Sequence, residues 1–144
     1  MQRDLNLLKS VLSVPTKTYQ EDLMIEFLID WMRENKIEYS VDEHWNVYAT
    51  KGEISENSFY PCVVAHTDTV HNIVDEIIVK EEHLLRPYTF GKDFGNEQVL
   101  CLKAYDKEDK PTGIGGDDKC GIFICLELLK LLLKLQIYAR KLTN

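Results

Sequence analysis

The chain has 144 residues, and its 24 acidic and 17 basic side chains give a formal net charge of −7. This length favours one domain with a sizeable core, and a negative chain without a basic stripe is a poor match for nucleic acid. The polar, amphipathic amino terminus lacks the pattern of a secretion signal. Its cysteines lie in or beside apolar runs without a C-x-x-C pair, which predicts reduced, buried side chains in a cytoplasmic protein: Cys62, Cys101, Cys120 and Cys125.

Two amphipathic helices are predicted at the start of the chain. The first spans residues 4–12, and Pro15 follows its end. Thr18 and Glu21 have the spacing of a capping box, which predicts a second helix running to about Asn35. One apolar stripe on this second helix predicts packing against a sheet; the stripe contains Met24, Phe27, Leu28, Trp31 and Met32.

Strands are predicted next. Residues 38–41 and 45–50 alternate in polarity around a short turn and indicate a hairpin, and residues 51–58 read as a polar loop. The apolar, β-favouring run of residues 62–65 predicts a strand that is buried on both faces, as in a parallel sheet covered by helices.

The second half of the chain has the same mixed character. Residues 70–79 predict a short helix and a strand, and residues 99–105 predict another strand. A charged turn with Pro111 and Gly113 precedes a strongly apolar helix that is predicted to begin near Gly121. The order of elements indicates an α/β domain with a mixed β-sheet flanked by helices.

His66 and Asp68 directly follow the apolar run of residues 62–65. In open α/β sheets ligands gather at the carboxyl ends of strands, and a neutral imidazole is a good zinc ligand. A ligand histidine commonly donates its second ring N–H to a carboxylate, so we expect Asp68 to orient His66. A lone H-x-D is a weak motif, and polar residues at a strand end are its plain alternative.

A second motif lies about fifty residues later, in the sequence Gly115-Gly116-Asp117-Asp118-Lys119-Cys120-Gly121. Its glycines permit tight backbone turns, and a carboxylate on such a loop can bridge two divalent ions. The alternative is a glycine-rich turn with an aspartate at the start of a helix. The pattern of a phosphate-binding loop is absent, because Lys119 is followed by Cys120.

Together, the segments Ala65-His66-Thr67-Asp68-Thr69-Val70 and Gly115 to Gly121 resemble the M20 family of zinc metallopeptidases, and within it the peptidase T or tripeptidase branch. The resemblance covers roughly residues 5–133. It implies that residues 1–144 form the amino-terminal portion of a catalytic domain with the zinc-peptidase (phosphorylase/hydrolase-like) fold. The chain is expected to be a truncated form, without the lid or dimerisation domain and the carboxyl-terminal part.

The resemblance also implies roles for individual residues. His66 would be a metal ligand, Asp68 the catalytic acid that orients it, and Asp117 a carboxylate that bridges two zinc ions. Cobalt or manganese would accept the same ligands. Asp118 and Lys119 would support the loop. The implied substrate is a short peptide, and the general base, part of a later Glu-Glu pair, is expected beyond this chain. The pair Glu81-Glu82 between the motifs is interpreted as solvated charge.

The last predicted helix is unusually apolar. Residues 122–138 contain only a narrow polar stripe, formed by Glu127, Lys130 and Lys134. These charges argue against a membrane span. A helix this apolar is normally covered on most sides, so we expect its exposed face to drive self-association into a homo-oligomer. An inactive homologue that folds, self-associates and binds metal weakly is the alternative to a peptidase.

Overall fold

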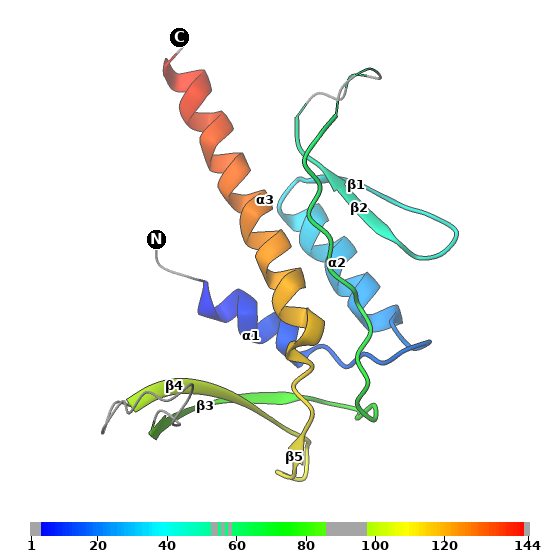
Figure 1. Ribbon diagram of the computed structural model, residues 1–144, viewed down its shortest axis with the longest axis vertical. Helices are drawn as coiled ribbons and strands as arrows, with labels where there is room; N and C mark the ends of the chain where they lie inside the picture. Colours follow the sequence, from blue (N-terminus) through cyan, green and yellow to red (C-terminus); the bar gives the residue numbers. More distant parts are fainter. Residues whose placement is uncertain (1–3, 53–54, 56, 58, 86–97, 143–144) are drawn as a thin grey trace, which may run out of the picture.

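The computed structural model describes residues 4–52, 55, 57, 59–85 and 98–142, and the surroundings of side chains as far as residue 132. These residues form a small α/β arrangement of three helices and two antiparallel sheets (Figure 1). Every strand pair in these residues is antiparallel, so the predicted mixed sheet is wrong.

Helices α1 (Leu5–Ser13) and α2 (Asp22–Glu34) confirm the two predicted helices. The side chain of Asp4 caps α1 by accepting a hydrogen bond of 3.0 Å from the backbone N–H of Leu7. The predicted capping box at the start of α2 is wrong, because Glu21 makes no side-chain cap there. Glu21 accepts a hydrogen bond from the Tyr19 N–H instead, and the Thr18 hydroxyl is engaged elsewhere.

The predicted hairpin is confirmed as β1 (Glu38–Val41) and β2 (Val47–Thr50). A second sheet contains β3 (Ile78–Leu85), β4 (Gln98–Tyr105) and β5 (Pro111–Thr112) in that order. The strand at residues 99–105 was therefore predicted correctly. The short helix predicted within residues 70–79 is not formed, and residues 70–77 consist of bends and irregular backbone.

Helix α3 (Gly116–Leu142) begins five residues earlier than predicted, through a kink at its start. Asp117 and Asp118 have non-helical backbone angles, and the peptide bond between them is cis. The carboxylate of Asp118 accepts a hydrogen bond of 3.0 Å from the N–H of Gly121. Asp118 therefore caps the start of the helix, as in the alternative interpretation of the second motif.

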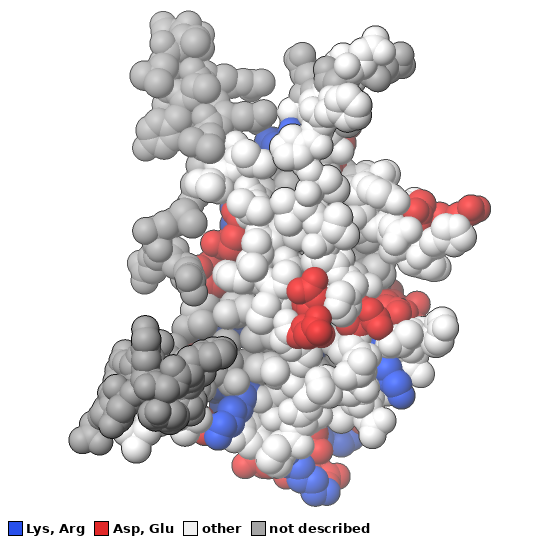
Figure 2. Space-filling view, in the orientation of Figure 1, with Lys and Arg blue, Asp and Glu red and all other residues white. Residues whose placement is uncertain are grey.

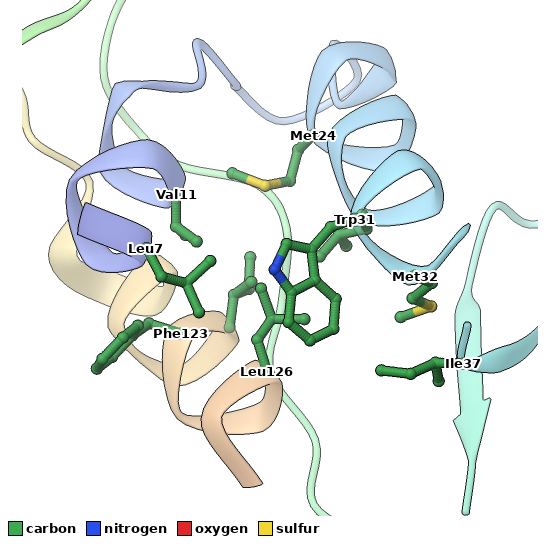
Figure 3. Packing of buried hydrophobic residues seen from close by; sticks show 10 residues of the cluster. Leu7, Val11, Met24, Trp31, Met32, Ile37, Phe123 and Leu126 are labelled. Carbon is green, nitrogen blue, oxygen red and sulfur yellow. The ribbon is translucent and has the colours of Figure 1, made fainter. Parts of the chain in front are cut away.

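The core lies where the three helices meet. Trp31 of α2 projects toward Leu7 and Val11 of α1 and toward Leu126 of α3 (Figure 3). The hairpin covers part of this cluster with Tyr39, Val47 and Ala49. In Figure 1 the carboxyl-terminal turns of α3 extend beyond the other elements. On α3, three apolar side chains spaced four residues apart are exposed: Ile124, Leu128 and Leu132.

Residues 62–65 do not form the buried strand that the sequence predicts. They belong to neither sheet, and Val63 and Val64 are 58% and 82% exposed. Ala65 alone packs against the core. The prediction failed because a strand is buried on both faces only when neighbouring strands and covering helices exist.

The predicted burial of the cysteines is also partly wrong. Cys62 and Cys120 are exposed, whereas Cys101 and Cys125 are half-buried. All four are free thiols, as predicted. In the part of the chain that the structure describes, no helix combines the length and the apolar character needed to cross a membrane.

Candidate metal site

The two sequence motifs meet at the side chain of His66. Its Nδ1 lies 3.0 Å from Asp68 Oδ1, and its Nε2 lies 3.0 Å from Asp117 Oδ1. The two aspartates come from segments about fifty residues apart in the sequence. The structure therefore brings together all three predicted site residues, with Asp68 on the ring nitrogen that faces away from Asp117.

Backbone geometry places Asp117 beside His66. Gly115 has a φ of +65°, and a Cβ built there would lie 2.7 Å from Cγ2 of Thr69. The loop thus needs a glycine both for its left-handed conformation and for its close approach to Thr69. The Asp118 carboxylate also lies 3.4 Å from the His66 N–H, which links the helix start to the histidine backbone.

Lys119 anchors this loop from inside the molecule. Its side chain is 1% exposed, and its ammonium donates hydrogen bonds to the backbone carbonyls of Leu12 and Val14 at 3.1 and 2.7 Å. Burial lowers the pKa of Lys119 to about 8. A lysine next to two aspartates was expected to support the loop, and this placement agrees with that expectation, although the sequence gives no sign of its burial.

Four hydrogen bonds hold residues 67–69 against residues 16–18, and we call this set the threonine clamp. The Thr16 hydroxyl donates to Thr67 O at 2.8 Å, and the buried Thr69 hydroxyl donates to Thr16 O at 2.6 Å. The Thr18 N–H donates to Thr69 O at 3.3 Å, and the Thr18 hydroxyl donates to Asp68 Oδ2 at 2.7 Å. Sequence reasoning missed this role of Thr18, because its spacing to Glu21 resembled a helix cap.

The electrostatics of the three residues follow from these contacts. The Asp117 carboxylate, followed by that of Asp68, raises the pKa of His66 above its ordinary value. The Thr18 hydroxyl, and after it His66, lowers the pKa of Asp68. With Nδ1–H donating to Asp68, Nε2 either shares a second proton with Asp117 or offers its lone pair to a cation.

The donor set suits zinc in kind but is incomplete in number. Imidazole nitrogen and carboxylate oxygen both bind zinc at about 2.0–2.2 Å, so two such ligands of a tetrahedral ion lie roughly 3.3 Å apart. The 3.0 Å between His66 Nε2 and Asp117 Oδ1 is close to this value, and the 96% exposed Asp117 side chain has room to adjust. Within the described ranges, however, no three His, Cys, Asp or Glu side chains converge on one position.

The other acidic pair and the remaining histidines make no hydrogen bond to His66, Asp68 or Asp117 among the described residues. Glu82 accepts hydrogen bonds from Tyr105 and Lys103 on the neighbouring strand, and Glu81 pairs with Lys9. These contacts fit the interpretation of Glu81 and Glu82 as surface charges. His71 and His83 are exposed, as predicted, and His44 in the hairpin turn is exposed too.

The face of the molecule in Figure 2 has acidic side chains near its centre, and basic side chains lie mostly toward the end that carries the three-stranded sheet.

Comparisons of the chain with protein-family models, with curated proteins and with solved structures gave no match. Any assignment of activity therefore rests on the two motifs and on the geometry of their side chains.

Proposed function

We propose that this chain is the amino-terminal portion of the catalytic domain of an M20-like, two-zinc aminopeptidase that acts on short peptides. The observation that carries the proposal is the His66–Asp117 pair, in which a ring nitrogen and a carboxylate oxygen from distant segments lie 3.0 Å apart. Asp68 on the opposite ring nitrogen adds support, because ligand histidines commonly have such a partner.

Each of the three residues has a defined task in this proposal. Asp68 holds the proton on Nδ1 of His66 and thereby leaves the Nε2 lone pair directed toward Asp117. Asp117, with a 96% exposed side chain, would contribute a carboxylate whose second oxygen could bind another ion. Bound zinc would supply Lewis acidity toward a scissile carbonyl and toward water. By the resemblance, the general base and the other ligands belong to later parts of such a domain, as does the zinc-peptidase fold as a whole.

A second candidate is a non-catalytic homologue that binds one divalent ion weakly. The specific observation in its favour is that only two ligands converge among the residues described. A catalytic zinc needs about three protein ligands and an open position for water. For the 144 residues on their own, we propose metal binding without peptide hydrolysis.

Zinc titration by calorimetry tests the site itself. We expect weak binding to the unmodified protein, with a dissociation constant in the micromolar range or above, and loss of binding in His66→Ala and Asp117→Ala. His44→Ala is the matched control, because His44 is exposed in the hairpin turn. Nanomolar binding that survives both His66→Ala and Asp117→Ala would refute this site.

Peptide hydrolysis tests whether these 144 residues are sufficient for catalysis, and the intact mass of the natural protein separates the two candidates. The purified 144-residue chain with added zinc or cobalt is expected to leave a tripeptide intact, and metal-dependent cleavage would show that the described site is sufficient. The intact mass of the natural protein in cells completes the comparison. A species near 16.8 kDa favours the non-catalytic homologue, and a species two to three times larger favours the complete peptidase.

Self-association and a cytoplasmic location remain predictions. The exposed face of α3, with Ile124 and Leu128, is expected to pair with a second copy of the chain because it leaves apolar area in water. Light scattering at tens of micromolar should show dimers or larger species, and Ile124→Glu combined with Leu128→Glu should restore the monomer. A monomer in the unmodified protein would contradict this prediction.

A further inference from the structure

The turn between α1 and α2 presents a hydroxyl to the candidate metal site. Lys17 and Gln20 close this turn with a pair of backbone hydrogen bonds of 3.3 and 2.8 Å, and Tyr19 between them has a φ of +68°. Thr18 therefore sits on a locally closed turn. Its hydroxyl donates to Asp68 Oδ2 at 2.7 Å, across fifty residues of sequence.

This contact engages the second oxygen of Asp68. Oδ1 lies 3.0 Å from Nδ1 of His66, while Oδ2 accepts from Thr18. A carboxylate held at one oxygen only can rotate about its Cβ–Cγ bond, whereas one held at both oxygens from opposite sides has a fixed plane. The plane of the Asp68 carboxylate sets the direction in which Nδ1–H of His66 donates its hydrogen bond. Because Nε2 belongs to the same ring, its direction is set as well.

We propose that Thr18 is a positioning residue for the metal site and acts through Asp68 on the ring of His66. The inference deepens the proposed function and rests on it for its biological meaning. Thr18 touches neither the Nε2 atom nor Asp117. Its contribution is to favour the state of His66 in which Nδ1 carries the proton and Nε2 faces Asp117.

A purely structural role for Thr18 can be separated from this positioning role. The backbone N–H of Thr18 donates to Thr69 O, and the Thr16 and Thr69 hydroxyls supply the other contacts of the threonine clamp. Thr18→Val keeps the shape of the side chain and this backbone contact, and it removes only the hydroxyl. Since Thr18 is exposed, this change is expected to leave the fold in place.

The test reads the tautomer of His66 in the metal-free protein, from long-range ¹H–¹⁵N correlation spectra at a pH where the ring is neutral. Thr18→Val should reduce the ratio of the Nδ1–H to the Nε2–H tautomer by about three- to tenfold, the scale of one ordinary net hydrogen bond. Thr18→Ser, which retains the hydroxyl, should restore the ratio. Asp68→Ala sets the loss of the carboxylate contact, because it keeps the Asp68 carbonyl that lies 3.1 Å from Nδ1. Thr50→Val in β2 is the matched control, and His44 is an internal reference.

The outcomes are distinct for the two proposals. An unchanged tautomer ratio in Thr18→Val, or a Thr18→Ser protein that behaves like Thr18→Val, overturns the positioning role whatever the protein does with zinc. A zinc titration of the same samples tests the metal site: absence of zinc binding in the unmodified protein, together with a tautomer shift in Thr18→Val, overturns the proposed function alone. If both hold, Thr18→Val should weaken zinc binding by a similar factor.

Discussion

Residues 62–65 and residues 67–69 lie on either side of His66 in the chain, yet their surroundings differ sharply. Val63 and Val64 are mostly exposed, whereas Thr69 is 3% exposed and is held by the threonine clamp. The apolar residues 62–65 resemble a core strand in sequence but lie outside the sheets. The polar residues 67–69 are held in place by hydrogen bonds to residues 16–18. Side-chain hydrogen bonds to a neighbouring turn can thus order a segment that no sheet contains.

Among the contacts that hold the site in place, the loss of the Lys119 side chain in Lys119→Ala should reduce stability most. The substitution removes a buried side chain and leaves the carbonyls of Leu12 and Val14 without their donor. We expect the free energy of unfolding to fall by about 2–4 kcal/mol, as for other losses of buried volume and hydrogen bonds. Urea denaturation measures this change, and a loss below about 0.5 kcal/mol would contradict the anchoring role of Lys119.

The same lysine predicts a dependence of stability on pH. The unfolded chain keeps the proton on Lys119 up to a pKa near 10.5, whereas the folded protein releases it near pH 8. Between these values the unfolded state binds more protons, so the free energy of unfolding should rise with pH, by roughly 1–3 kcal/mol over the interval. Urea denaturation between pH 7.5 and pH 10.5 measures this rise. Lys119→Met cannot titrate, so its free energy of unfolding should rise less with pH than that of the unmodified protein. Equal pH profiles of stability for the two proteins would contradict the contribution of Lys119.

A reciprocal pair of substitutions compares the two segments directly. Thr69→Val removes the buried hydroxyl that donates to Thr16 O and leaves that carbonyl without this partner, so it should cost about 1–2 kcal/mol. Val64→Thr makes the reverse change of the same shape on an 82% exposed side chain and should cost less than about 0.5 kcal/mol. Thermal unfolding of both variants under one condition gives the comparison, and equal costs would remove the distinction between the two segments.

The helices and the hairpin were predictable because their signals are local. Asp4 caps the first helix, and polarity alternates with period two in β1 and β2. The exposure of residues 62–64 was not predictable. An apolar run indicates that a segment can be buried, but it does not indicate whether neighbouring strands exist to bury it. Cys62 was placed wrongly for the same reason, since it lies on that segment.

The three candidate residues of the site could be named from sequence motifs, whereas the contacts that support them could not, and the metal-binding role of the three stays a prediction. His66, Asp68 and Asp117 carry recognisable motifs, and their meeting in the structure agrees with the expected geometry. Thr18 had no such signal, because its partner lies fifty positions away and its local spacing suggested a helix cap. Contacts of this kind follow from tertiary packing alone.

The long sequence separations within the threonine clamp have a consequence for folding kinetics. Its side-chain contacts join residues 50 to 53 positions apart, and the contacts of Lys119 span 105 and 107 positions. Such contacts require the closure of long loops before they return any stabilising energy, so they form late compared with the helices and the hairpin. His66 and Asp117 consequently meet only after α1 and the start of α3 have docked, and the appearance of zinc affinity during refolding would mark the completion of the tertiary structure.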